Sequence, residues 1–369
     1  MDKDNIFEDM KSTYDKRYRI KSAVSRVLKA AFTFIVCPAV LCASLAGGAL
    51  TAADTLADES GASPFGLTFR QVSTSGKSAK LQLLQPCDEM IRETEEDILT
   101  RLYEFDRTQV PDGCYGIVPV SLYRQADPGT VYVSDAGDKK QIDAAEYIKK
   151  DLAVRYKNEY RVLIVHTHGT EAYSPEGALY CGKGDYPRSE NKNENVVGIG
   201  DIFERVFIEA GIKTVHCEIP IDAESYSRSY QNAAKIIKDY LKKYPDIKYM
   251  FDIHRDAVEL SDGSKARMVT AVDGQICAQL MFVVGSDRLV PENENWRDNL
   301  TLAVKLQTAL DEKYPGLMRP INIKQGAFNQ YFTPLSVLIE VGSDGNSLEE
   351  AKRSAEILAE QMVKTIKEG

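Results

Sequence analysis

Histidine, tryptophan and closely spaced cysteine pairs are scarce in this chain of 369 residues. It has four histidines and one tryptophan, and its seven cysteines include no CxxC pair. The wide spacing excludes a cysteine-rich metal site and gives no disulfide framework, although it leaves room for one disulfide outside the cytoplasm. Basic residues are outnumbered, 46 to 55, and the formal net charge is −9. This balance argues against a nucleic-acid binder, which usually carries a basic domain.

Charge is absent from residues 30–53, which are predominantly apolar. A run of about 20 apolar residues is long enough to cross a bilayer as a helix. A basic stretch without acids, from Lys16 to Lys29, precedes this run, and Asp54 follows it. The order predicts a single-pass cell-membrane anchor with a cytoplasmic N-terminus and an extracytoplasmic remainder. A cleaved signal peptide is the alternative, because small residues before Asp54 fit a peptidase site.

The composition divides the whole chain into five expected segments. Residues 1–29 form the basic cytoplasmic segment and residues 30–53 the transmembrane anchor. Residues 54–80 are rich in Ser, Ala, Gly and Thr, which is typical of a linker. Residues 81–158 carry no recognisable chemistry and are expected to form a small accessory region. Residues 159–369 alternate strand and helix patterns, which predicts an α/β domain with a mostly parallel sheet flanked by helices.

Apolar periodicity and terminal Gly or Pro residues mark the expected elements. The accessory region has a helix pattern and two strand patterns, and the α/β domain has short apolar runs separated by amphipathic stretches. The expected strands are 116–124, 130–135, 162–165, 212–216, 247–254, 266–272, 278–285 and 336–342, and the expected helices are 87–106, 193–211, 229–246, 294–316 and 346–369.

Three histidines and a glutamate stand at the carboxyl ends of expected strands. They are His166, His168, His254 and Glu340. In open parallel sheets, functional sites form at this edge. Two or more histidines with a carboxylate and an open position are the composition of a catalytic zinc site. The metal supplies a nucleophilic water near neutral pH, and a further carboxylate takes up and returns its proton.

Each of these residues also has a structural interpretation. A single histidine is more often structural than a ligand, and Glu340 between apolar neighbours is also explained by an arginine partner. Arg255 is interpreted either as the bidentate ligand of a substrate carboxylate or as a structural partner, of Asp256 among others. His216 follows an expected strand without a neighbouring motif, and we assign it a structural role. The joint placement on one sheet edge favours the metal interpretation.

Several stretches of the chain resemble the stage II sporulation protein P family of peptidoglycan amidases. They occur in the order of that family between residues 160 and 367, and the expected membrane anchor also fits it. Residues 54–158 carry no motif that resembles the family. The matching stretches are VLIVHTHGTEAY, NVVGIGDIFERVFIEAGI, YPDIKYMFDIHRDA, NENWRDNLTLAVKLQTALDEKYPGL, GAFNQYFTPLSVLIEVG and GNSLEEAKRSAEILAEQM.

The resemblance implies a Zn²⁺-dependent N-acetylmuramoyl-L-alanine amidase, which cleaves the amide between N-acetylmuramic acid and the L-alanine of the stem peptide. It also implies an endopeptidase activity on peptide cross-links and a role in septal wall remodelling during sporulation engulfment. The implied substrate is peptidoglycan. The implied partners are a lytic transglycosylase and a membrane protein of the engulfment machinery.

A more distant resemblance, to the broader zinc amidase fold, concerns single positions. His168 and His254 fall in the places of its two ligand histidines, and Glu340 falls in the place of its strand-end glutamate. Those amidases have a ligand glutamate just before a helix. This sequence has Asn193 there, with Glu194 one residue later.

The two ligand histidines therefore need a third protein ligand from elsewhere. Glu171 is the first choice and Glu194 the alternative. We expect Glu340 to act as general base and acid, and His166 either to polarise the scissile carbonyl or to bind the metal. Arg255 is expected to bind substrate. Two alternative functions stay open, a zinc carboxypeptidase or other metallopeptidase on stem peptides, and an inactive wall-binding scaffold.

Overall fold

The computed structural model of the protein describes residues 104–121, 133–135 and 143–368. The expected anchor at 30–53, the linker and most of the expected helix at 87–106 lie outside the described residues. Within the described part of the chain, no helix is both long and apolar enough to cross a membrane.

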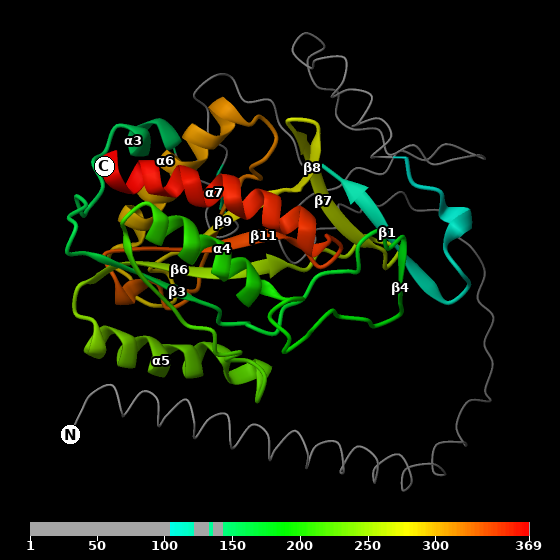
Figure 1. Cartoon of the computed structure of the whole chain (residues 1–369), viewed down its shortest axis with the longest axis horizontal. Coiled ribbons are helices and arrows are strands. Elements are labelled where there is room, and N and C mark those ends of the chain that lie inside the picture. The colour runs from blue at the N-terminus through cyan, green and yellow to red at the C-terminus, as the bar shows by residue number, and fades with distance from the viewer. Residues whose placement is uncertain (1–103, 122–132, 136–142, 369) are drawn as a thin grey trace, which may run out of the picture. The chain divides into compact units, whose positions relative to one another are not determined.

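The described chain folds into strands and helices, and both kinds of element are labelled in Figure 1. The strands are β1 (Cys114–Val120), β2 (Val133–Asp135), β3 (Arg161–Val165), β4 (Tyr180–Gly182), β5 (Lys213–His216), β6 (Ile247–Asp256), β7 (Lys265–Val272), β8 (Gln275–Ala278), β9 (Leu280–Gly285), β10 (Ile321–Lys324) and β11 (Leu335–Ser343). The helices are α3 (Ala144–Ile148), α4 (Val196–Glu209), α5 (Ser229–Lys243), α6 (Trp296–Lys313) and α7 (Leu348–Glu368).

The main sheet has seven strands in the order β2-β10-β9-β11-β6-β3-β5. Neighbouring strands in it are parallel except β9 and β11, which are antiparallel. The predicted α/β domain with a mostly parallel sheet is thereby confirmed. Because β5, β3, β6 and β11 all run the same way, their carboxyl ends lie along one edge of the sheet.

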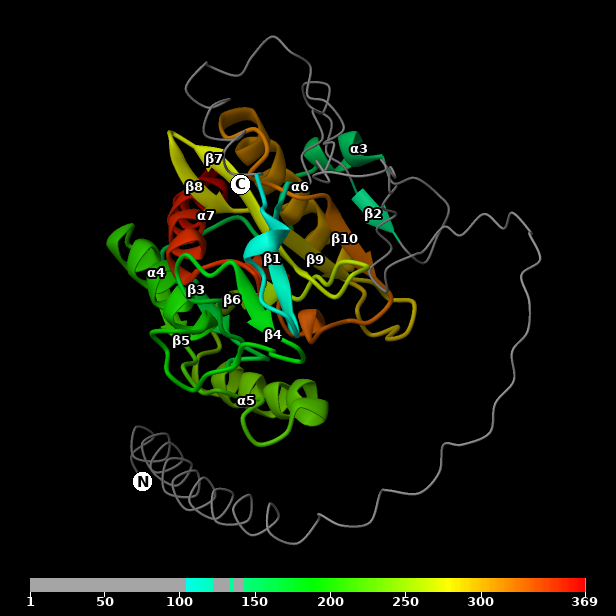
Figure 2. The same cartoon turned by 90° about the vertical axis from the view of Figure 1, so that its right-hand side faces the viewer.

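Helices cover both faces of the main sheet. Helices α4, α6 and α7 lie on one face and α5 lies on the other, as the two views show (Figures 1 and 2). The core-facing side of α4 carries the fully buried residues Ile199, Phe203 and Phe207. Helix α7 begins with a capping box, in which the Ser347 N–H donates to Glu350 Oε2 at 3.1 Å and the Glu350 N–H donates to Ser347 Oγ at 3.4 Å.

A second sheet of four strands has the order β4-β1-β7-β8. Strand β1 belongs to the expected accessory region, whereas β7 and β8 form a hairpin between two strands of the main sheet. The expected strands 266–272 and 278–285 therefore lie in different sheets. Strand β2 pairs with β10 of the main sheet, and Tyr147 near the end of α3 is in the same buried cluster as Leu300 of α6. Parts of segment 81–158 thus share the core of the main sheet.

The end of β11 is shaped by a backbone irregularity. The pairing of β11 with β6 shifts register between Glu340 and Ser343. Gly342 lies there with a φ of 74°, and a Cβ at this position would approach the Ala278 side chain to 2.9 Å. Just before the shift, Glu340 is in register with His254. The two strand-end residues therefore lie side by side.

Candidate functional site

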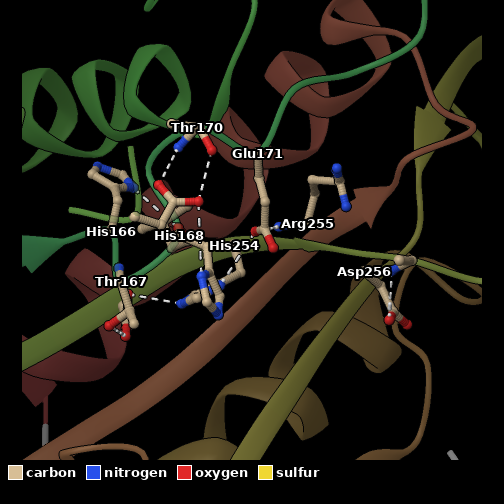
Figure 3. Close-up of polar contacts among 12 residues, drawn as sticks. His166, Thr167, His168, Thr170, Glu171, His254, Arg255 and Asp256 are labelled. Carbon is tan, nitrogen blue, oxygen red and sulfur yellow. Dashed lines mark hydrogen bonds and ion pairs between the residues drawn. The ribbon is translucent and has the colours of Figure 1, made fainter. Parts of the chain in front are cut away.

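His168 and His254 come together where β3 and β6 end. Their ring centroids are 5.3 Å apart and the ring planes are nearly perpendicular, at 83° (Figure 3). Both residues are buried. His168 also stacks on Tyr226 at 4.5 Å and meets the edge of Tyr230 at 5.5 Å. Aromatic packing therefore fixes the plane of the His168 ring.

Glu171 lies beside this histidine pair. Its Oε2 is 3.3 Å from His254 Nδ1 and accepts a hydrogen bond from the backbone N–H of Arg255 at 3.1 Å. Burial raises the pKa of Glu171, but the hydrogen bond and charge of His254 outweigh burial and bring the pKa to about 2. Glu171 is therefore an ionised carboxylate at neutral pH.

Glu194, the alternative to Glu171, lies in a different environment. It is exposed and accepts hydrogen bonds from the Ser189 hydroxyl at 2.6 Å and the Asn191 amide at 2.9 Å. The loop that carries Glu171 packs against the start of α4, where the Val196 N–H donates to the Glu171 carbonyl at 2.9 Å. This packing gives Glu171 a place next to the N-terminus of α4 although the two are far apart in sequence.

Asp252 was not among the residues singled out from the sequence. Its Oδ1 is 2.9 Å from His254 Nε2, and its carboxylate accepts hydrogen bonds from the Thr167 N–H at 2.8 Å and the Thr167 hydroxyl at 2.6 Å. Burial raises the pKa of Asp252, but the charge and hydrogen bond of His254 outweigh burial, so that the net shift is downward. A carboxylate two residues before a histidine on one strand was the available signal, because alternate residues share a face.

His166 is fully buried and makes a different set of contacts. Its Nδ1 is 3.0 Å from the Ile253 carbonyl, and its Nε2 is 2.8 Å from His216 Nε2. Burial and the neighbouring His216 lower the pKa of His166 to about 3, so the ring is neutral. Both ring nitrogens thus have protein partners, and the catalytic role expected for His166 remains a prediction that these contacts do not favour.

Glu340 is only partly buried as a residue, but its Oε2 is buried and has no hydrogen-bond partner among the described residues. Burial and the nearby Asp256 charge raise the pKa of Glu340 to about 8, against the opposing influence of His254. A carboxyl group with a pKa near neutrality can accept and return a proton during turnover. This property is the one expected of Glu340 from the sequence.

Arg255 and Asp256 do not pair with each other in the contacts described. Arg255 Nε donates to the Ala172 carbonyl and one of its terminal nitrogens donates to the Pro187 carbonyl, both at 2.8 Å. Asp256 pairs with the buried Arg319 at 2.8 Å. The interpretation of Arg255 as a structural partner of the fold agrees with these bonds, whereas its predicted binding of substrate remains a prediction.

The donor set of His168, Glu171 and His254 fits a zinc ion. Two donors bound to zinc at about 2.0–2.1 Å in tetrahedral geometry lie about 3.3–3.4 Å apart, and 3.3 Å separates His254 Nδ1 from Glu171 Oε2. The buried Nδ1 of His168 has no hydrogen-bond partner among the described residues, and it lies 3.8 Å from Asp222 Oδ2. Burial lowers the pKa of His254, but Asp252 and Glu171 outweigh burial and raise it well above its usual value. A cation is thus favoured between these groups, and a metal can take the place of the proton.

The chain was compared with known proteins by sequence. The profile of a family described as stage II sporulation protein P (SpoIIP) matches residues 125–363, which begins within the expected accessory region. The chain is similar to the stage II sporulation protein P of Bacillus subtilis (strain 168), with 29% identity over 234 residues. That match covers 60% of this chain and 55% of the relative, so the chain spans about half the length of the relative.

Solved structures of N-acetylmuramoyl-L-alanine amidases are more distant. The amidase from Clostridium difficile 630 is 16% identical with a TM-score of 0.34, and the match covers 57% of this chain and 96% of that one. AmiC2 of Nostoc punctiforme is 14% identical with a TM-score of 0.33, covering 57% of this chain and 94% of that one. The fold assignment above rests on strand order and not on these similarities.

Proposed function

This chain belongs to the stage II sporulation protein P family, and on that premise we propose that it is a zinc-dependent peptidoglycan hydrolase. The bond cleaved is the amide between N-acetylmuramic acid and the L-alanine of the stem peptide. One observation carries the proposal. An ionised Glu171 and two histidines meet at the sheet edge, and beside them Glu340 has a pKa of about 8.

The metal would be held by His168, His254 and Glu171. When bound, zinc polarises the scissile carbonyl and lowers the pKa of a water molecule. Asp252 contacts His254 Nε2 at 2.9 Å, which leaves Nδ1 facing Glu171. A carboxylate on the second ring nitrogen orients a ligand histidine and raises its basicity. Asp252 is therefore proposed as a positioning residue for His254.

Glu340 is proposed to move the proton. In the metal-free chain, burial and the Asp256 charge keep its carboxyl group protonated at neutral pH. A cation at the neighbouring ligands lowers this pKa, because opposite charge favours the ionised form. Glu340 then takes the proton of the attacking water and delivers it to the leaving amine nitrogen.

The N-terminal sequence and the family support a proposal for the cellular setting. We propose that residues 30–53 anchor the chain in the cell membrane with the hydrolase domain outside the cytoplasm. The setting is septal wall remodelling during sporulation engulfment, with a lytic transglycosylase and a membrane protein as partners. The charge-free apolar run and its flanking charges support the anchor, and the family supports the setting.

Digestion of purified cell wall by the full-length protein tests the reaction, with mass spectrometry of the products. The expected products are muramic acid with a free lactyl carboxylate and stem peptides with a free L-alanine amino group. Release of single amino acids from stem peptides would instead identify a carboxypeptidase. Intact wall after incubation with zinc-loaded protein would identify a scaffold.

A further inference from the structure

A second group of possible metal ligands lies on the other side of His166. His216 ends β5, Glu218 follows two residues later, and Asp201 and Glu204 project from α4. One ligand atom from each of these four residues lies within 4.8 Å of the other three. His216 Nδ1 is 3.5 Å from both Asp201 Oδ1 and Glu204 Oε2.

The hydrogen bonds of His166 determine which nitrogen of His216 carries a proton. The Ile253 carbonyl can only accept, so His166 Nδ1 is the donor in that contact, and the Nε2 of a neutral ring is then an acceptor. His216 Nε2, at 2.8 Å, must therefore donate to it. In a neutral His216 this leaves a lone pair on Nδ1.

That lone pair points at two carboxylates. The His216 side chain is 1% exposed, and its Nδ1 has no hydrogen-bond partner among the described residues. A bare nitrogen lone pair facing the oxygens of Asp201 and Glu204 is unfavourable unless a cation lies between them. Lys192 supplies positive charge at the outer side, with its Nζ 3.1 Å from Asp201 and 3.5 Å from Glu218.

Helix α4 makes room for the histidine pair at Gly200. A Cβ at this position would lie 2.4 Å from His216 Nε2 and 2.6 Å from His166 Nε2. The two imidazoles thus pack directly against the helix backbone. The neighbouring turn of the same helix contributes Asp201 and Glu204, so the position of the ring and of the carboxylates is set by one element.

We propose that Asp201, Glu204, His216 and Glu218 form a second binding site for a divalent transition-metal cation of the zinc class. One imidazole with three carboxylates is a nitrogen and oxygen donor set that suits such an ion. The carboxylates are 32–48% exposed, which gives the ion an entry path from solvent. A bound ion would link α4 to β5. Through His216, it would also fix the position of His166, close to the first site, the proposed zinc site of His168, Glu171 and His254. This inference does not depend on the proposed hydrolase function.

A proton is the competing cation. Burial lowers the pKa of His216, but the neighbouring carboxylates of Asp201 and Glu204 outweigh burial and raise it. If a proton alone fills the gap, the cluster is an ion pair of His216 with its acids and binds no metal. The two alternatives differ in zinc content.

The zinc content of the full-length protein distinguishes a bound metal ion from a proton. It is measured by elemental analysis after dialysis against ZnCl₂. We expect about two zinc ions per chain in the unaltered protein and about one in Glu204→Gln, whose amide is a poor ligand. The matched control is Glu209→Gln on the same helix, where the lost carboxylate pairs with Arg205 at 3.2 Å. Glu209→Gln should keep about two zinc ions per chain. His254→Ala should keep about one, which stays sensitive to a further Glu204→Gln change.

The zinc affinity of the second site gives an independent readout, measured by competition with a chelator in the His254→Ala background. Glu204→Gln should weaken it by more than about tenfold, since even an outer-shell partner contributes about 10–100-fold. Lys192→Met should strengthen it, because a competing positive charge is removed. Equal zinc content in Glu204→Gln, Glu209→Gln and the unaltered protein overturns the proposal. A His254→Ala variant that retains no zinc also overturns the proposal of a second site. If only the proposed hydrolase site fails to bind zinc, the unaltered protein still binds one ion, and Glu204→Gln removes that ion.

Discussion

Glu171 and Glu340 are chemically identical side chains with opposite pKa shifts. Glu171 faces His254 and a backbone N–H, which stabilise its charge and bring its pKa to about 2. Burial and the Asp256 charge raise the pKa of Glu340 to about 8, and its Oε2 has no hydrogen-bond partner among the described residues. Environment therefore gives one carboxylate the charge that the proposed metal ligand needs and the other the pKa that the proposed proton carrier needs.

Glu340→Gln tests this separation. The amide keeps the size of the side chain and cannot accept and return the proton, so wall cleavage should fall by about 10²–10⁴-fold. Zinc content and thermal unfolding should stay near those of the unaltered protein. Loss of the metal would show instead that Glu340 is a ligand. Cleavage at a near-normal rate would place the base elsewhere.

The choice between Glu171 and Glu194 as ligand can be tested with a matched pair of amide variants. Glu171→Gln should lose most of the zinc of the first site, because Glu171 Oε2 lies 3.3 Å from His254 Nδ1. Glu194→Gln should keep that zinc, because Glu194 is exposed and bonded to Ser189 and Asn191. Both are measured by elemental analysis in a Glu204→Gln background, so that one site is counted. The reverse result would make Glu194 the ligand.

Among the helices, α4 lies next to both of the proposed metal sites. It is held by packing of Ile199, Phe203 and Phe207 on the sheet, and its N-cap Asn195 accepts from the Val197 N–H at 2.9 Å. The loop that packs against the start of α4 carries Glu171. The position of α4 therefore sets that of Glu171 through this loop, and it sets the positions of Asp201 and Glu204 directly.

Gly200→Ala should destabilise the protein although Ala is the better helix former by about 1 kcal/mol. The new methyl group would lie 2.4 Å from His216 Nε2 and 2.6 Å from His166 Nε2. Overpacking of this kind costs about 1–3 kcal/mol, and denaturant unfolding measures it. The double variant with His216→Ala should recover part of the loss. A more stable Gly200→Ala would contradict the close packing of the two rings.

Helix α6 carries a carboxyl group that opposes stability at neutral pH. Burial raises the pKa of Asp311 to about 7 against a hydrogen bond from Gln307. Because the folded state binds this proton more tightly than the unfolded state, stability falls as pH rises from about 4 to about 7.

Asp311→Asn removes this dependence. We expect a stabilisation of about 1–3 kcal/mol at pH 8, at about 1.4 kcal/mol per pKa unit and reduced for partial exposure, and little change at pH 4. Urea unfolding at both pH values measures it. The exposed neighbour Glu312→Gln is the control and should shift stability by less than about 0.5 kcal/mol. An equal gain at both pH values would refute the assignment.

Across the whole molecule, the described parts of the accessory segment pack against the α/β domain. Strand β2 extends the main sheet, α3 packs on α6 and β1 pairs with β7 of the second sheet. The Lys305 ammonium of α6 also donates to the Ile148 carbonyl at 3.0 Å. These contacts join segments before and after the site into one packed unit.

The membrane topology is the prediction that concerns the whole chain. Protease added to intact protoplasts should remove the part after residue 54 and spare the first residues, because basic residues precede the apolar run 30–53. Immunoblots against both ends, with lysed protoplasts as the control, measure this. A mature N-terminus near Asp54 would establish a cleaved signal peptide instead.

Local sequence patterns were enough to locate four parallel strands and the edge of the sheet at which they end. Apolar runs and amphipathic periodicity located β3, β5, β6 and β11, and parallel strands bring their carboxyl ends to one edge. The neighbourhood of His168, His254 and Glu340 followed from that rule. These features are local, since each depends on a few consecutive residues.

Which side chains become partners depended on the packing of distant segments. His166 meets His216 and the carbonyl of Ile253, 50 and 87 residues away, and Glu171 rather than Glu194 reaches His254. The separation of 266–272 and 278–285 into two sheets was likewise invisible to periodicity, as was the short strand β10. Such pairings depend on strand order, register and loop packing, which arise from contacts between distant segments that no local pattern encodes.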